Sequence, residues 1–170
     1  MDAPLLGVML FIASEVMFFA AFFGAYFNVK ATAPVWPPEG TEFITPWPIA
    51  AMITVVLVIS SFTMQWATMR IRKGDRTGMN RGLLITLILG LLFFVLVGYE
   101  YFTLVTHDDF GINSGVYGTL FYTMTGFHGA HVTMGTLWLG TLLKDAWKGK
   151  LPKEKALNLE IAALYWHFVD

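Results

Sequence analysis

The sequence predicts an all-α integral membrane protein, a single domain over residues 1–170 built as a bundle of five transmembrane helices. Two observations lead to this class. Hydrophobic residues make up 56% of the 170 residues and charged residues 14%, and the charges are gathered between long uncharged stretches, one of which runs for 34 residues from Phe110 to Leu143. Since a helix rises ~1.5 Å per residue, ~20 apolar residues cross the ~30 Å hydrocarbon layer.

Composition also excludes several other classes. The chain has no cysteine, which rules out disulfides, thiolate metal sites and thiol catalysis. Its formal net charge is −1, so nothing in the charge balance argues for a nucleic-acid partner.

The first predicted helix covers residues 4–29, where Glu15 is the single charged residue. No basic segment precedes it and no small-residue cleavage pattern follows it, so we expect a retained helix and not a signal peptide. The next segment, residues 30–47, is rich in proline, which removes backbone donors and stops helices. It predicts an ordered external loop, with Trp36 and Trp47 at the membrane interface.

Four further helices are predicted, over residues 47–70, 82–104, 115–143 and 157–170. The basic segment 70–81, the turn-rich segment 106–115 and the lysine-rich segment 144–155 connect them. Only about 14 residues of the last apolar stretch are present, fewer than the ~20 that cross a bilayer. We therefore expect the last helix to continue beyond Asp170.

The basic residues predict the orientation. Ten of the eleven Lys and Arg residues lie in the segments 70–81 and 144–155, and Lys30 is the other one. Short loops rich in Lys and Arg face the cytoplasm. The sequence therefore predicts a cytoplasmic N-terminus.

The predicted spans contain acids and imidazoles but no Lys or Arg. Such groups are costly in the membrane and usually face a protein interior or a wet cavity. Without a basic partner, they suggest proton sharing or binding of lipid head groups rather than salt bridges. The candidate residues are Glu15, Glu100, His128, His131, Glu160, His167 and Asp170.

Glu15 has Phe11, Phe18, Phe19 and Phe22 at helical-neighbour spacings. An ionised carboxylate in these surroundings would need a polar partner or water. Two interpretations stay open at this point, a proton-exchanging carboxyl beside a helix seam or a structural acid that hydrogen-bonds to a neighbouring helix. The phenylalanines themselves favour a lipid-facing aromatic surface over a quinone or porphyrin site.

His128 and His131 are three residues apart, which places both rings on one side of their helix. Gly126 and Gly129 have the same spacing and would let a neighbouring helix approach closely. The histidines could bind metal, or one of them could ligate haem together with His167. A hydrogen bond from an imidazole to a neighbouring acid is the simpler expectation.

Several strings, in this order along nearly the whole chain, resemble subunit III of the haem-copper respiratory oxidases. They are Leu10-Phe-Ile-Ala-Ser-Glu-Val-Met-Phe-Phe-Ala-Ala-Phe-Phe23, Trp36-Pro-Pro-Glu-Gly40, Tyr99-Glu-Tyr-Phe102, Gly115-Val-Tyr-Gly118, Thr125-Gly-Phe-His-Gly-Ala-His131 and Tyr165-Trp-His-Phe-Val-Asp170.

The resemblance implies a helical subunit without redox centres, packed against a catalytic subunit I that carries haem and copper. Family members commonly have seven helices divided by a lipid-filled cleft, and this chain resembles them from the third helix onward. Glu15 matches a membrane-buried glutamate of that helix, and His128, His131 and Glu160 match acid and histidine positions of the five-helix group. Two features depart from the family's pattern: Gly24, where tryptophan is common, and Ile44-Thr-Pro-Trp-Pro48. They weaken the implication that this chain makes the family's lipid contacts in the cleft.

The function so implied is that of a non-redox accessory subunit of a bacterial terminal oxidase in the plasma membrane, not catalytic by itself. It would stabilise the catalytic subunit, support proton uptake and hold phospholipid, with no cofactor bound by this chain. Related short subunits of quinol oxidases or nitric oxide reductases share the pattern. A self-contained proton channel or transporter is the competing class, although the chain shows no convincing internal repeat.

Overall fold

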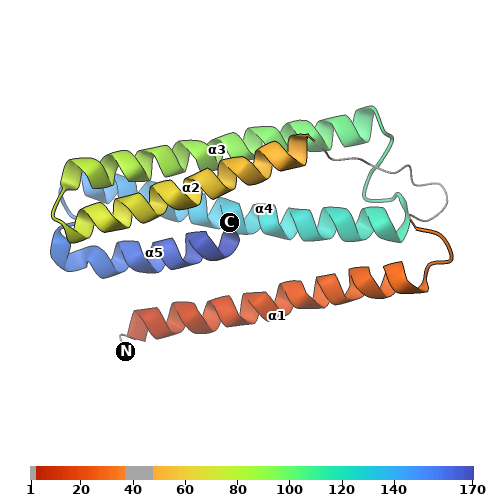
Figure 1. Ribbon diagram of the computed structural model, residues 1–170, viewed down its shortest axis with the longest axis horizontal. Coiled ribbons are helices and arrows are strands. Elements are labelled where there is room, and N and C mark those ends of the chain that lie inside the picture. The colour runs from red at the N-terminus through yellow and green to blue at the C-terminus, as the bar shows by residue number, and fades with distance from the viewer. Residues whose placement is uncertain (1–2, 37–47) are drawn as a thin grey trace.

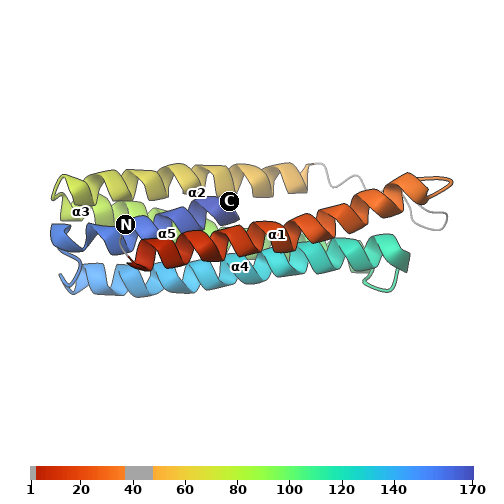
Figure 2. The same ribbon diagram turned by 90° about the horizontal axis from the view of Figure 1, so that it is seen from below.

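The computed structural model describes residues 3–36 and 48–170, and in these residues five long helices lie side by side along one axis (Figures 1 and 2). Their bounds are α1 (Ala3–Thr32), α2 (Ile49–Arg72), α3 (Arg76–Thr106), α4 (Gly115–Trp147) and α5 (Ala156–Val169), with a short 3-10 turn, η1 (Lys153–Lys155), before α5. The all-helical class with five helices is confirmed. The predicted external loop lies mostly at residues 37–47, outside the described residues, and so does Trp47.

The helices are arranged as a packed group and one peripheral member. α2 and α3 form a long antiparallel hairpin, and α5 packs against both α2 and α4. α1 contacts α4 and α5 from outside (Figure 2), and none of the residues of this fully described helix is buried. α5 ends about half-way along the bundle (Figure 1).

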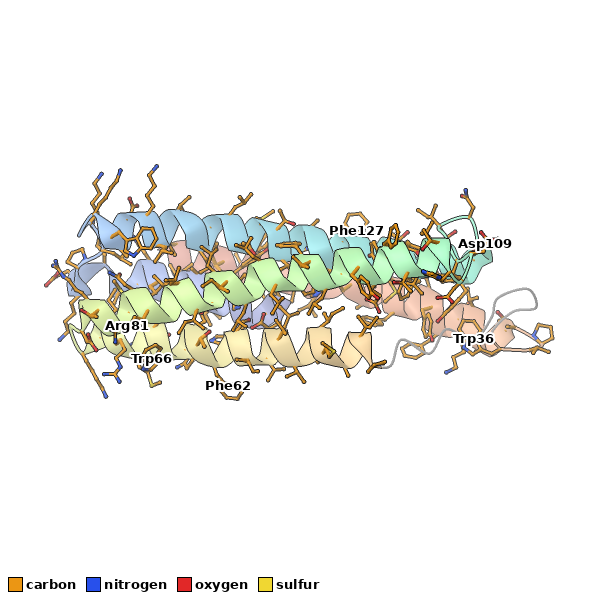
Figure 3. The ribbon with its side chains drawn as sticks, turned by 90° about the horizontal axis from the view of Figure 1, so that it is seen from above. Trp36, Phe62, Trp66, Arg81, Asp109 and Phe127 are labelled. Atoms are coloured by element: carbon orange, nitrogen blue, oxygen red, sulfur yellow. The ribbon has the colours of Figure 1, made fainter. Side chains whose placement is uncertain are left out.

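Three helices of the described chain, α1, α2 and α3, are long and apolar enough to cross a membrane. α4 has 33 residues, so at ~1.5 Å per residue it is also long enough, but its threonines, glycines and two histidines lower its hydropathy. Large apolar side chains point away from the bundle, such as Phe62, which is 72% exposed (Figure 3). An outward apolar surface of this kind suits contact with lipid.

Most of the positive charges gather at one end of the bundle. The connection from α2 to α3 and the connection from α4 to α5 lie at this end, together with the start of α1 (Figure 1). Arg81 lies toward this basic end, whereas Asp109 and Trp36 lie at the opposite end (Figure 3). The tertiary structure thus brings the two basic segments to the same side, as the predicted orientation requires.

The predicted basic segment 70–81 is mostly helical, which corrects its assignment as a loop. α2 continues to Arg72 and α3 begins at Arg76. The early start of α3 has a local cause, because the Asp75 carboxylate accepts a hydrogen bond from the backbone N–H of Gly78, at 2.9 Å, as an N-cap. This bond, together with the nearby Arg70, holds the pKa of Asp75 below its ordinary value.

The core is built around Trp166 of α5, which is fully buried. Its indole N–H donates to the hydroxyl of Ser60 on α2, at 3.0 Å. Gly90 of α3 and Gly135 of α4 lie against the ring, and a Cβ at either position would come within 3.0 Å of it. Small residues therefore let three helices close around one large side chain.

Gly126 and Gly129 do not have the predicted role within the described chain. A Cβ added at either position would meet nothing within 4 Å. The close approaches are instead at Gly135 and Gly90, and at Gly82 against Ala67. The spacing of these glycines along the sequence does not show which of them lie at a contact between helices, since the helices that carry them are similar in composition.

Candidate functional site

The central feature of the site is a pair formed between α1 and α4. Nε2 of His131 lies 2.8 Å from Oε2 of Glu15, and the two side chains are only 12% and 18% exposed. The Glu15 carboxyl, which the sequence predicts to be costly to place in an apolar helix, thus has a polar partner on a neighbouring helix. This pairing agrees with the simpler of the interpretations drawn from the sequence, an imidazole bonded to an acid.

The hydrogen bonds of His131 place one proton on Nδ1 and a second within the bond to Glu15. Its Nδ1 is 2.6 Å from the backbone carbonyl oxygen of Phe127, and because a carbonyl only accepts, Nδ1 carries a hydrogen. The bond from Nε2 to Glu15 then contains one further proton. That proton lies either on the imidazole, facing a carboxylate, or on the carboxyl, facing a neutral imidazole. The pair can therefore hold one proton without a net charge.

Aromatic side chains surround and orient this pair. The ring of Phe19 lies edge-on to the imidazole of His131, with centroids 5.3 Å apart. Phe18 of α1 packs edge-on against Phe127 of α4, and Phe22 lies at a tilt to the same ring. The phenylalanine-rich segment of α1 is thus partly a packing surface for α4, not lipid-facing throughout as predicted.

Tyr165 of α5 supports the pair from the third helix. Its hydroxyl donates to the backbone carbonyl oxygen of His131, at 2.9 Å, and its ring lies beside Phe11 of α1, with centroids 6.1 Å apart. The residue is 2% exposed. Nothing in the sequence singles out Tyr165 separately, although it lies in the string of residues 165–170.

His128 faces a different neighbour from His131. Its ring packs edge-on against Phe93 of α3, with centroids 5.8 Å apart. It lines two cavities, an apolar one of about 640 Å³ shared with His131 and bounded by α1, and one of about 250 Å³ bounded by α2 and α3. Glu100 and Asp170 line the smaller cavity, so the structure brings Glu100 near His128 but not near the Glu15 and His131 pair.

Glu160 lies apart from the histidines, at the basic end. Its Oε1 accepts from Nε of Arg72 at 2.7 Å. The expectation that the acids lack a basic partner is therefore wrong for Glu160. The reason is that α2 extends two residues further than predicted, and this brings Arg72 alongside the start of α5.

His167 of α5 and Asp170, the residue that follows α5, both contact α2. The His167 ring contacts the Ser61 hydroxyl through Nδ1 and the amide oxygen of Gln65 through Nε2, at 3.3 Å. Both ring nitrogens of His131 and of His167 are engaged in hydrogen bonds, which argues against an axial haem pair of these two histidines. Among the described residues, no three His, Cys, Asp or Glu side chains are grouped as metal ligands.

Four residues of these sites were not predicted: Ser61, Gln65, Arg72 and Tyr165. Ser61 and Gln65 carry a weak signal, as polar residues four apart on one apolar helix. Arg72 falls in the segment 70–81, which the sequence predicts to be a loop. Ser61, Gln65 and Arg72 meet their partners because α5 packs against α2, and Tyr165 meets His131 because α5 also packs against α4.

Taken together, long apolar helices, positive charge at one end and an internal carboxyl–imidazole pair define a multi-pass membrane protein of the helical-bundle class. The family model of cytochrome c oxidase subunit III matches residues 2–170. The chain belongs to this family, and the resemblance found in the sequence is confirmed.

Relatives from distant eukaryotes show the same similarity. Cytochrome c oxidase subunit 3 of Prototheca wickerhamii and that of Rattus norvegicus are each 39% identical over an aligned length of 170 positions, and the alignment covers 96% of this chain and 63% of the relative. The protein of the same name from Arabidopsis thaliana is 41% identical over 96% of this chain and 62% of its own length. The chain thus spans slightly less than two thirds of these curated relatives.

Proposed function

We propose that this chain is a non-redox accessory subunit of a terminal oxidase, which stabilises the catalytic subunit I and supports its uptake of protons. The observation that carries the proposal is the Glu15 and His131 pair, set between α1 and α4 in a chain of the subunit III family. Carboxyl, imidazole and hydroxyl groups exchange protons but do not accept electrons. We therefore assign haem and copper to partner subunits.

The contacts with partners and lipid are proposed from the exposed surface of α1. Leu10, Met17 and Phe27 are 64%, 75% and 60% exposed. Such a surface needs lipid or another membrane subunit against it. The apolar cavity between α1 and α4, about 640 Å³ and lined by side chains such as Val16, Phe23 and Met124, has the size and lining to take a phospholipid acyl chain.

We propose that the protein lies in the bacterial plasma membrane with its basic end toward the cytoplasm. The charge asymmetry between the two ends is the pattern that cytoplasmic loops of membrane proteins follow. The relatives named above are eukaryotic, so fractionation of the source cells, with antibody against the loop at residues 148–155, is the direct test of this placement.

The function is tested by purification and turnover. We expect a haem-copper catalytic subunit to accompany the chain from mild detergent. Glu15→Ala and His131→Ala should leave the haem content of that complex unchanged, while its turnover or its working lifetime falls. A chain that purifies without such a partner, or that is itself coloured by haem, would contradict the proposal.

A matched control variant distinguishes the effect of losing the Glu15 and His131 pair from general damage to α1. Ser14→Ala removes only a hydroxyl that bonds to its own helix at Phe11, and turnover of this variant should equal that of the wild type. Proton flux through liposomes that contain the isolated chain would instead favour the channel or transporter class.

A further inference from the structure

A polar cluster lies on the outer surface of the bundle, where α5 packs on α2. It consists of Ser61 and Gln65 on α2 and His167 on α5. Nδ1 of His167 contacts the hydroxyl of Ser61, and Nε2 lies 3.3 Å from the amide oxygen of Gln65. Gln65 and His167 are both exposed. Hydrogen-bonded polar side chains thus stand on a surface that faces the membrane.

The cluster lies deeper in the membrane than the charged residues of the basic end. Gln65 is seven residues inward from Arg72 along α2, which corresponds to about 10 Å of helix. Hydrocarbon tails at that depth offer no hydrogen-bond partner. Polar and ionisable side chains within membrane spans normally face the interior of a bundle or a wet cavity. Gln65 and His167 face outward instead, so their position needs another explanation.

Other exposed polar groups on the spans differ from this cluster, because they bond to their own helices. The Ser14 hydroxyl donates to the carbonyl oxygen three residues earlier, at 2.6 Å, and the Thr133 hydroxyl donates to the one four residues earlier, at 2.8 Å. Such bonds satisfy a hydroxyl without any neighbouring helix. The Gln65 amide oxygen is used by His167, but its nitrogen has no acceptor in the part of the chain that the structure describes.

A groove beside the cluster gives this surface a shape that a partner can enter. α5 lies between α2 and the start of α1 (Figure 1), and these three helices line a groove of about 250 Å³. Leu5, Met69 and Leu164 are among its apolar walls, while Gln65 and His167 supply polar groups. The groove therefore combines apolar surface with a few hydrogen-bonding groups at membrane depth.

The rim of the groove toward the basic end adds further hydrogen-bond donors. Arg72 and Glu160 line this part, and Nε of Arg72 is 2.7 Å from the Glu160 carboxylate. The Arg72 side chain is nevertheless 67% exposed. A guanidinium has five N–H groups, so this pair leaves donors on Arg72 unused. Gln65 and Arg72 together present N–H groups along one side of the groove, and their complement is a surface that carries oxygen acceptors.

We propose that this groove is the docking surface for a transmembrane helix of the catalytic subunit, which carries an oxygen acceptor opposite Gln65. A carboxyl, hydroxyl or side-chain amide oxygen accepts from the Gln65 amide, and apolar side chains of the same helix fill the walls. Polar side chains make such hydrogen bonds between membrane helices. Lipid tails would fill the groove but leave the amide unsatisfied, at a cost in free energy. This inference rests on the proposed function, because it assigns a surface to the partner named there.

The surface is tested by photo-crosslinking in the native membrane. A diazirine amino acid is placed at Met69 or Leu164, groove positions that are 47% and 43% exposed. Illumination should join the chain to the catalytic subunit and shift its band on a denaturing gel by the mass of that subunit. The control positions are Ile88 and Leu137, which are 54% and 68% exposed and lie on α3 and α4, outside the groove. They should give no product with the catalytic subunit.

The control positions are matched in depth. Ile88 is seven residues inward from Arg81 and Leu137 is seven residues inward from Lys144, the same separation as between Gln65 and Arg72. Adducts with lipid alone at Met69 and Leu164, in a membrane where the catalytic subunit still co-purifies with the chain, would overturn the docking surface but leave the proposed function intact. If no catalytic subunit co-purifies, the proposed function fails and this inference fails with it.

A second measurement tests the acceptor opposite Gln65. Gln65→Leu removes the amide from an exposed position, so the chain should still fold, which thermal unfolding checks. The dissociation constant of the catalytic subunit, measured by dilution of the purified complex in detergent, should rise roughly 3- to 30-fold, the range expected for one hydrogen bond between membrane helices. Thr133→Val, which removes a hydroxyl bonded to its own helix, should leave that constant unchanged. An unchanged constant in folded Gln65→Leu would overturn the contact.

Discussion

Nε2 of His131 lies 2.8 Å from Oε2 of Glu15, and this contact joins residues that are 116 positions apart in the chain. It is the main polar contact that attaches α1 to the rest of the bundle. Because α1 has no buried residue, aromatic packing on α4 and this pair together determine where the helix lies. The same contact also gives the Glu15 carboxyl a polar partner inside the bundle.

We predict that Glu15 and His131 stabilise the fold as a coupled pair. Hydrogen bonds to charged groups contribute about 1.5–3 kcal/mol, so a double-mutant cycle with Glu15→Ala and His131→Ala should give a coupling energy within that range. The measurement is unfolding of the full chain in detergent. The matched cycle with Glu15→Ala and His107→Ala, a histidine outside the pair, should give a coupling energy near zero, and equal values in the two cycles would refute the pairing.

Gly135 should not tolerate a methyl group, although another glycine on the same helix should. A Cβ at Gly135 would lie 3.0 Å from the Trp166 ring and 3.1 Å from Tyr165, whereas one at Gly140 meets nothing within 4 Å. Gly140→Ala should therefore gain up to about 1 kcal/mol from helix propensity. Gly135→Ala should lose stability by about 1–3 kcal/mol, the usual cost of overpacking. Thermal unfolding of both variants in one detergent checks the difference.

Trp166 should be the most sensitive core position. Trp166→Ala should cost about 3–5 kcal/mol because it leaves a cavity among α2, α3 and α4. Trp166→Phe keeps an aromatic ring but leaves Ser60 without its donor, so a loss of about 1–3 kcal/mol is expected. Trp147→Ala is the control, since that side chain is 63% exposed and its removal should change stability by less than about 0.5 kcal/mol.

Asp75 should give the fold a dependence on acid pH. Its ordinary pKa of 3.8 is lowered in the folded chain, mainly by the hydrogen bond from Gly78. A carboxyl whose folded pKa is depressed contributes stability that is fully present above the unfolded pKa and lost as the pH falls through the folded value. The difference in melting temperature between wild type and Asp75→Ala should therefore shrink below about pH 4.

Asp75→Asn is the companion variant to this prediction. Asparagine is also a good N-cap but has no charge to titrate. Its melting temperature should exceed that of Asp75→Ala by the same amount at neutral and at acid pH. A difference between Asp75→Asn and Asp75→Ala that falls with pH would show that the effect comes from another group.

Much of the fold and part of the site followed from local sequence. Uncharged stretches such as residues 110–143 predicted the helices, and the clustering of Lys and Arg predicted that two connections share one end of the bundle. Glu15 and His131 stood out because an ionisable side chain in an apolar helix is costly wherever that helix packs. These properties depend on residue type and spacing along one helix, so they needed no knowledge of neighbours.

Tertiary structure alone decided which polar groups meet. Two histidines three residues apart face different partners, Glu15 for His131 and Phe93 for His128, and Glu160 pairs with Arg72 instead of joining them. Such contacts depend on the rotation and register of whole helices, which are set where Trp166 fits against Gly90 and Gly135. A shift of one helical turn, ~5.4 Å, would leave every local pattern unchanged but separate each of these pairs.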